Sequence, residues 1–266
     1  MSKLVRSMVL VGLSLGAAAT GAQAPDATVA DPEGHQVVLE NDHVRVIRAI
    51  AAHGYKSPMH SHLPLAVISL GTGRVRFTTP DGKKQILDVY PGMAFWGDNV
   101  QHSWELLAGE VNAVGVEVKA AKGAPAPAKP SGGAPAGAAL DPRDATIADP
   151  DVHQVMLEND HVRIFRALAA HGYKSPMHSH PPRVIVSLGT GRLRLTLPDG
   201  KKQILDLSPG QVLWIGDAEH SWELLAGEVN VVVVEVKAAK AIETPPPSPS
   251  SGAATAAGVG AGALSG

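Results

Sequence analysis

The chain contains two copies of one long segment, and this duplication limits the folds it can adopt. Residues 31–119 and 149–237 align without a gap at an offset of 118 residues, and 63 of the 89 aligned positions are identical. Each copy is long enough to enclose a hydrophobic core of its own, and the period is too long for a short-repeat solenoid. The sequence therefore predicts two similar domains in tandem.

Each copy consists of short apolar segments separated by turn residues. In the first copy, residues 74–78 alternate polar and apolar side chains, which is typical of a half-buried strand, and Pro80-Asp81-Gly82 follows as a turn. No segment shows a helical period over ten residues. Short strands with turns every ~8–12 residues indicate a sandwich or barrel, so we expect an all-β fold. The other expected strands are 36–40, 43–50, 65–70, 85–89, 93–96, 103–107 and 111–118.

The segments outside the two copies have a different composition. Residues 1–24 predict a secretory signal peptide, because positive residues precede an uncharged apolar run and small residues follow it. The run is shorter than the ~20 residues of a spanning helix, although a retained anchor is the alternative. We expect a periplasmic or secreted protein without a membrane segment after signal removal. Residues 120–147, rich in Ala, Pro and Gly, predict a linker, residues 238–266 a disordered tail, and residues 28–119 and 148–237 the two domains.

Composition narrows the classes of partner and ligand. The formal net charge of −2 gives no electrostatic case for binding nucleic acid. The chain has no cysteine, so a metal site would have to use histidine and carboxylate ligands.

Each copy carries two histidines separated by one residue, within a nine-residue segment that is identical in both copies. They are His60 and His62 in the first copy, and His178 and His180 in the second. Side chains two residues apart lie on the same face of a strand. Each pair would therefore direct both imidazoles the same way.

A third histidine begins a later expected strand in each copy. It is His102 in the first copy and His220 in the second, and Ser-Trp follows it in both. In a barrel, this strand can return beside the one that carries the pair. Three imidazoles at one place suit a divalent metal, so we predict two metal sites; the alternative is a set of structural histidines in hydrogen-bond networks.

The spacing of these residues resembles the two motifs of the cupin superfamily. The first motif is matched in the first copy by Gly54, His60, His62 and Gly73. The second motif, a Pro-Gly turn followed by a histidine, is matched by Pro91-Gly92 and His102. The second copy matches at the same offsets. The resemblance covers most of both copies and implies a bicupin, with two tandem antiparallel β-barrels of the double-stranded β-helix or jelly-roll type.

Two positions in each copy depart from the family pattern. Where the family often has a glutamate ligand, this chain has Ala66 and Val184, and where it often has an asparagine, this chain has Leu106 and Leu224. Neutral imidazoles alone leave a divalent ion with its full charge and with open positions, which favours a small anionic or chelating ligand. The site resembles the three-His subgroup, which includes thiol and β-diketone-cleaving dioxygenases, more than the oxalate-acting bicupins.

The resemblance implies a metal-dependent dioxygenase-type enzyme acting on a small chelating substrate. Fe(II) is the favoured metal, and Mn, Ni, Zn or Cu also suit imidazole ligands. The alternatives are a metal-dependent isomerase or lyase and a non-catalytic periplasmic protein that binds a metal or small ligand. Cupin-type barrels often associate, so a homo-oligomer is also implied.

Other residues near the motifs are not assigned as ligands. His35 and His153 are expected to be structural or surface residues. Trp104 shares a strand face with the third histidine, and either packs in the core or lines a cavity. Tyr55 is expected in a solvated loop. Arg183 is expected on the surface; if it reached the cavity, the second site would prefer a carboxylate-bearing ligand.

Overall fold

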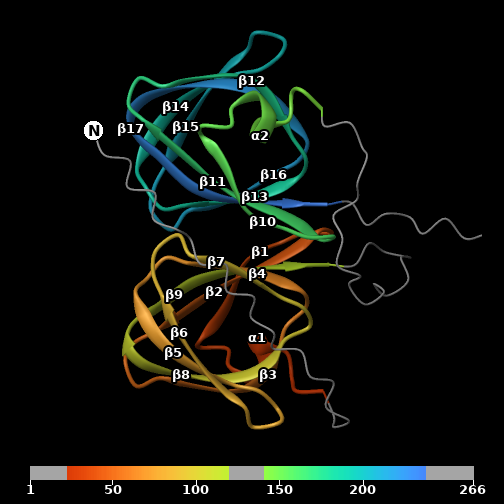
Figure 1. Cartoon of the computed structure of the whole chain (residues 1–266), viewed down its shortest axis with the longest axis vertical. Coiled ribbons are helices and arrows are strands. Elements are labelled where there is room, and N and C mark those ends of the chain that lie inside the picture. Colours follow the sequence, from red (N-terminus) through yellow and green to blue (C-terminus); the bar gives the residue numbers. More distant parts are fainter. Residues whose placement is uncertain (1–22, 120–140, 238–266) are drawn as a thin grey trace, which may run out of the picture.

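The structure, a computed structural model, describes residues 23–119 and 141–237. The predicted tail, the first 22 residues of the predicted signal peptide and most of the predicted linker lie outside the described residues. The two copies form two barrels that lie one above the other along the long axis of the molecule (Figure 1). The all-β prediction is confirmed. Among the described residues, no helix is long and apolar enough to cross a membrane.

The first copy folds into two antiparallel sheets that face each other. One sheet has the strand order β1-β2-β9-β4-β7 and the other has the order β3-β8-β5-β6. Apolar side chains of both sheets, including Phe77, Phe95 and Trp104, fill the space between them. The strands are β1 (His35–Glu40), β2 (Val44–Ala51), β3 (Lys56–Ser61), β4 (Leu65–Ser69), β5 (Gly73–Thr78), β6 (Lys84–Val89), β7 (Ala94–Gly97), β8 (Gln101–Gly109) and β9 (Val111–Val118).

The second copy repeats this arrangement, except that one long strand replaces two. β17 (Ala218–Val236) runs through the positions that β8 and β9 occupy in the first barrel. It therefore pairs with β11 and β13 in one sheet and with β12 and β14 in the other. The remaining strands are β10 (His153–Glu158), β11 (Val162–Ala170), β12 (Lys174–His180), β13 (Arg183–Ser187), β14 (Gly191–Thr196), β15 (Lys202–Leu207) and β16 (Val212–Ile215).

Each barrel is preceded by a four-residue helix, α1 (Ala27–Ala30) or α2 (Ala145–Ala148). The side chains of Asp26 and Asp144 cap these helices by accepting a hydrogen bond from a backbone N–H of the first turn. Each cap also pairs with an arginine of its barrel, Arg45 at 2.5 Å or Arg163 at 2.6 Å. α1 starts one residue before the predicted boundary at 28, and the first three residues of α2 fall in the segment predicted as linker.

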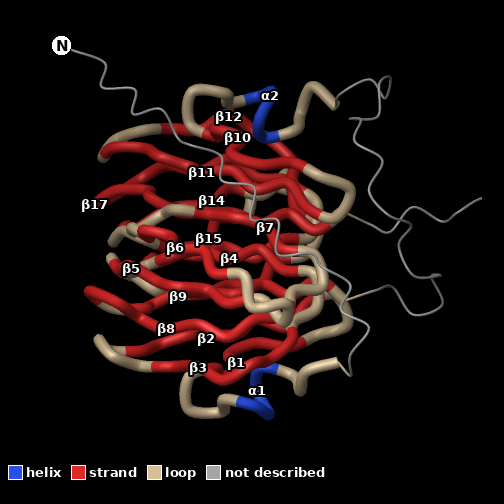
Figure 2. The backbone as a smooth tube through the Cα atoms, turned by 60° about the horizontal axis from the view of Figure 1, so that its bottom comes forward, coloured by secondary structure: helices blue, strands red, loops and turns tan. Residues whose placement is uncertain are grey.

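The two barrels pack through the outer faces of their five-stranded sheets. Residues of β2, β4 and β9 alternate between the barrel interior and this interface, where they form one hydrophobic core with β11, β13 and β17. Trp96 stacks on His161 and Trp214 stacks on His43, with ring centroids 5.3 and 5.4 Å apart. Because the same ring pair forms in both directions, the barrels are related by an approximate twofold axis. Figure 2 shows the strands in layers, with α1 and α2 at the far ends.

A substitution at Ile68 tests how much this interface contributes to the stability of the protein. Its side chain is fully buried in the core between the barrels, whereas Ile86 on β6 is 48% exposed. We expect Ile68→Ala to lower the free energy of unfolding by about 2–5 kcal/mol, because it leaves a cavity. The matched control Ile86→Ala should lower it by less than about 1 kcal/mol. Urea unfolding measures both, and equal losses would contradict the assignment of this face as a core.

Candidate metal centre

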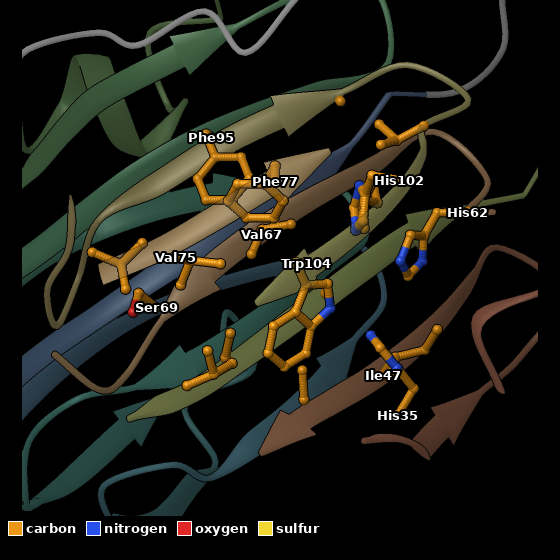
Figure 3. Close-up of a pocket in the computed structure, with 18 of the residues that line it drawn as sticks. His35, Ile47, His62, Val67, Ser69, Val75, Phe77, Phe95, His102 and Trp104 are labelled. Atoms are coloured by element: carbon orange, nitrogen blue, oxygen red, sulfur yellow. The ribbon is translucent and has the colours of Figure 1, made fainter. Parts of the chain in front are cut away.

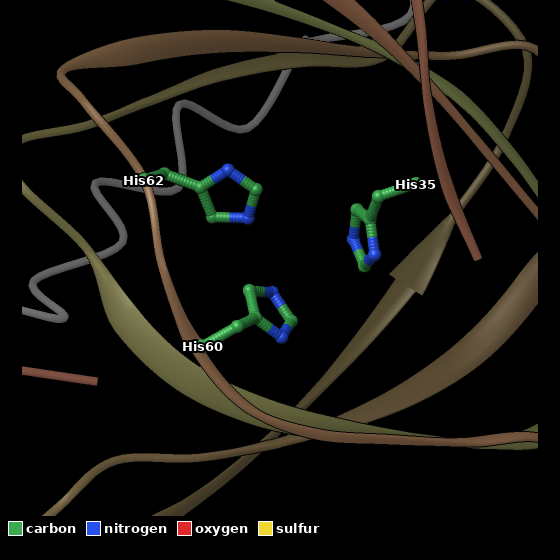
Figure 4. Close-up of side chains that lie close together, drawn as sticks. All are labelled: His35, His60 and His62. Atoms are coloured by element: carbon green, nitrogen blue, oxygen red, sulfur yellow. The ribbon is translucent and has the colours of Figure 1, made fainter. Parts of the chain in front are cut away.

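Four histidines gather at one end of the interior of the first barrel. His35 lies on β1, His60 on β3, His62 just after β3, and His102 on β8. One nitrogen from each of His35, His60 and His62 lies within 4.8 Å of the other two. The ring of His102 is 4.6 Å from that of His60 and 5.5 Å from that of His62, measured between centroids. Figure 3 shows His35, His62 and His102 at one end of a cavity, and Figure 4 shows the rings of His35, His60 and His62 around a shared space.

The second barrel repeats the cluster. His153, His178 and His180 again offer nitrogens within 4.8 Å of one another. The ring of His220 is 4.8 Å from that of His178 and 5.5 Å from that of His180.

The predicted site residues come together, and each cluster has one further member. His60 and His102 are direct cross-strand partners on β3 and β8, as are His178 and His220 on β12 and β17. His35 and His153, which the sequence pattern assigns to structural or surface positions, are only 5% exposed and lie among the others. The sequence signal for this histidine is its place four residues after an aspartate that ends the short helix in both copies, Asp31 or Asp149. The backbone N–H of each histidine donates to the carbonyl of that aspartate.

The tautomer of His60 is set by its backbone neighbour. Its Nδ1 lies 2.8 Å from the carbonyl oxygen of Pro58. A carbonyl can only accept, so Nδ1 carries the proton and Nε2 carries the lone pair. Nε2 is buried and has no hydrogen-bond partner among the described residues. His178 repeats this arrangement, with Nδ1 2.9 Å from the carbonyl oxygen of Pro176 and a buried, unpartnered Nε2.

The orientation of His62 is set by a buried carboxylate. Its Nδ1 lies 2.9 Å from Oε1 of Glu117, which is fully buried on β9. Glu117 accepts a 2.6 Å hydrogen bond from Arg45, which also donates to the helix cap Asp26. Nδ1 of His62 is thus engaged, and Nε2 remains for a ligand. In the second barrel, His180 lies 2.8 Å from Glu235 in the same way.

A second carboxylate supports the cluster from the other side. Asp31 accepts hydrogen bonds from Ser57 and from the hydroxyl of Tyr55, and its Oδ2 lies 3.2 Å from Nδ1 of His35. Burial raises the pKa of Asp31, but the hydrogen bonds from Ser57 and Tyr55 outweigh it and leave the pKa below its usual value. Tyr55 is therefore not a solvated loop residue, because it helps to hold the aspartate behind His35.

Burial keeps the imidazoles in the neutral form that binds a metal. Burial, with a smaller contribution from the nearby His62, lowers the pKa of His60 to about 3. Burial also holds the pKa of His102 well below its usual value. In the second barrel, burial lowers the pKa of His153 to about 4 and that of His220 to about 3. A cation that binds at neutral pH would not have to displace protons from these groups.

The positions expected to hold the missing carboxylate do not face the clusters. Ala66 and Val184 are buried in the core between the barrels. The neighbouring positions of β4, Leu65 and Val67, face the barrel interior and line its cavity. The carboxylate nearest the first cluster comes instead from β9, where Glu117 is the cross-strand partner of Leu65. It contacts His62 from behind and leaves the ligand space to the imidazoles.

A cavity of about 100 Å³ extends from the histidines into the first barrel. Trp104 lines it and is also part of the core, so both interpretations of this residue hold. In Figure 3, Trp104 lies near the histidines and Ser69 lies at the opposite end. The cavity wall carries no aspartate, glutamate, lysine or tyrosine.

Arg183 makes the second site electrostatically different from the first. The sequence predicts this side chain on the surface, and the prediction is wrong: Arg183 is 2% exposed and holds the position of Leu65 in the first barrel. Nη1 lies 3.3 Å from the carbonyl oxygen of Gly216 and 3.5 Å from that of Pro181. Burial lowers the pKa of Arg183 to about 10, so it stays charged at neutral pH. Burial is the main cause that lowers the pKa of His180 and the pKa of His220, and the charge of Arg183 lowers both further.

Comparison with solved structures identifies the fold. A structure of oxalate decarboxylase matches with a TM-score of 0.50 at 14% identity, covering 76% of this chain and 72% of that one. The coconut allergen cocosin also gives a TM-score of 0.50 at 14% identity, over 73% of this chain and 77% of its own. The chain has a two-barrel cupin fold. No family model and no curated protein sequence matches it.

A third similar structure is that of a cupin 2 conserved barrel domain protein from Leptotrichia buccalis. It shares 13% identity with a TM-score of 0.45, and covers 76% of this chain and 88% of its own. An enzyme and a coconut allergen share this fold, so function has to be argued from the site.

A substitution of the buried Glu117 tests how the first barrel orients its histidines. Glu117→Gln keeps the shape of the side chain but removes the charge that faces His62 and Arg45. We expect metal affinity of the first barrel to fall about 10–100-fold, as is typical when a carboxylate behind a ligating histidine is lost. The exposed Glu110→Gln should leave affinity unchanged. Equal affinity in the two variants, with folding checked by circular dichroism, would show that Glu117 has no part in the site.

Because of the buried charge of Arg183, we expect the two barrels to bind a metal ion with different affinities. A buried positive charge repels a divalent cation, and ~1.4 kcal/mol of repulsion already gives a factor of ten. Metal titrations in His178→Ala and His60→Ala backgrounds measure the first and the second barrel separately. We expect the second barrel to bind at least about tenfold more weakly, and Arg183→Leu to remove most of the difference. Arg192→Leu, on an exposed side chain, is the control; an Arg183→Leu variant without effect would contradict the prediction.

Proposed function

We propose that this protein is an exported metalloprotein that holds one divalent metal in each barrel, and that it acts as a dioxygenase-type enzyme on a small chelating substrate. The observation that supports metal binding most directly is the buried, unpartnered Nε2 of His60 and of His178. A buried acceptor without a partner is unfavourable by about 1–3 kcal/mol. A bound cation would satisfy it.

The donor set is compatible with several divalent metals. Three of the four histidines His35, His60, His62 and His102 would hold the metal in the first barrel, and three of His153, His178, His180 and His220 would hold it in the second. Imidazole suits Fe, Mn, Ni, Zn and Cu, and we favour Fe(II) because the clusters resemble the three-His dioxygenase type. A metal bound here would supply open positions for a chelating, anionic substrate and for dioxygen.

The cavity favours chemistry that depends on the metal rather than on side-chain acids and bases. Its wall offers no carboxylate, lysine or tyrosine, so a proton-transfer mechanism such as that of an isomerase or lyase would lack an obvious base besides histidine. The residues of the chain would orient the ligating imidazoles and exclude water. Phe77 packs edge-on against His102, with centroids 5.2 Å apart, and Trp104 lines the same wall.

A non-catalytic periplasmic cupin that binds a metal or small ligand is the second candidate. The observation that favours it is the same lack of acid–base groups, which a storage or binding protein does not need. Export to the periplasm or outside the cell is supported by the composition of residues 1–24. A homo-oligomer is proposed from the resemblance to associating cupin barrels.

Metal analysis combined with oxygen uptake separates these candidates. The purified protein would be analysed for bound metal and assayed with a panel of β-diketones, thiols and catechols. The paired variant His60→Ala and His178→Ala should lose bound metal and any oxygen uptake. The control His53→Ala and His171→Ala changes exposed histidines and should retain both. Metal content unchanged in the first pair would disprove the site, and bound zinc without turnover would favour the binding protein.

A further inference from the structure

The cavity of the first barrel is apolar behind its histidines. Its wall consists of aliphatic and aromatic side chains apart from the histidines, Ser69 and Asn112. The hydroxyl of Ser69 already donates to the carbonyl oxygen of Gly71 at 3.0 Å. A ligand that reaches past the metal site would therefore meet mainly apolar surface.

Small residues on β9 leave this space open. Ala113 and Gly115 line the cavity from the middle of the strand. A Cβ at Gly115 would lie 3.4 Å from Cδ1 of Leu65, an ordinary contact, and Gly115 does not have a positive φ. Glycine is therefore not required at position 115 by a close approach of neighbouring atoms or by a special backbone conformation. Glycine inside a strand is destabilising by about 0.5–1 kcal/mol relative to alanine, so the open space itself is the feature that it provides.

The second barrel fills the corresponding space. The counterparts of Ala113 and Gly115 are Val231 and Val233, which are 5% and 3% exposed and part of its core. Ile47, which lines the cavity, is replaced by Phe165, which is fully buried. The ring of Phe165 is stacked on that of His180, with centroids 5.8 Å apart and an interplanar angle of 11°. An aromatic ring thus occupies the side of the second cluster where the first barrel is open.

We propose that the first barrel, and not the second, takes a ligand with a short apolar chain behind a metal-binding head, such as an alkyl carboxylate or enolate. This inference rests on the proposed metal function for the head and on the cavity for the chain. At ~30 Å³ for a water-sized group, about 100 Å³ accommodates roughly three methylene-sized groups. The two barrels then differ in ligand class, although their histidines are the same.

Straight-chain carboxylates from acetate to pentanoate test the proposal in the metal-loaded His178→Ala protein, in which metal remains in the first barrel. Affinity measured by calorimetry should rise about fourfold for each added methylene, from the usual transfer free energy of that group. Gly115→Val, which copies the second barrel, should remove this rise and leave acetate affinity unchanged. Ala108→Val, at an exposed position of β8, is the control and should behave like the parent protein.

Xenon binding to the metal-free protein tests the cavity independently of the metal, because xenon enters dry apolar cavities. NMR of dissolved xenon should show binding to the wild-type protein and to Ala108→Val, and much weaker binding to Gly115→Val. Absence of xenon binding, or a chain-length rise that persists in Gly115→Val, would overturn the proposal. If no metal binds, the proposed function fails, and the xenon comparison still decides whether the apolar cavity exists.

Discussion

The hydrogen bond between Nδ1 of His60 and the carbonyl oxygen of Pro58 determines what the first site can do. The register of β3 against β8 shifts between Ser57 and His60, so the strand is irregular around this proline, which has no backbone N–H. The carbonyl of Pro58 is then available to the imidazole two residues later. It fixes the proton on Nδ1 and leaves the lone pair of Nε2 in the barrel. A feature of strand geometry thus produces a metal-binding nitrogen, and Pro176 repeats it.

The packing of the two barrels explains why the central strands are so apolar. β2, β4 and β9 bury one face in the barrel and the other against the second barrel, so both faces need apolar side chains. Glu117 is fully buried on β9, and it is compensated by Arg45 and His62. A buried ion pair of this kind gives little net stability, but loss of one partner is strongly unfavourable. The same contacts that hold His62 therefore connect the site to the helix cap Asp26.

Much of the fold and the core of the site follow from local sequence. The alternation of residues 74–78 and the turn at Pro80 predict β5 and the hairpin after it, and the spacing of His60 and His62 places both rings together. The return of His102 beside them also follows from barrel topology. These features depend on residues that are near one another in the chain or on a general property of barrels.

The parts that the sequence does not predict depend on register and long-range packing. His35 joins the cluster because Asp31, four residues before it, accepts a hydrogen bond from Ser57 of β3, and the ring of His35 lies 4.7 Å from that of His60. No periodicity in the sequence reveals this long-range contact. Ala66 and Val67 are neighbours on β4, yet Ala66 packs between the barrels and Val67 lines the cavity. A shift of one residue in register would exchange these two faces, and the sequence alone does not fix the register. Arg183 follows two prolines and carries a charge, both typical of surfaces, yet it lies in the barrel.

X-ray absorption spectroscopy of the metal-loaded protein tests the central claim most directly, because it reports the atoms bound to the metal. With zinc as the probe, the four-histidine clusters predict a shell dominated by nitrogen at about 2.0–2.1 Å, with the multiple-scattering pattern of at least three imidazoles. His60→Ala and His178→Ala together should abolish it. A shell dominated by carboxylate oxygen, or a spectrum unchanged in the paired variant, would contradict the claim that these histidines form the metal centres.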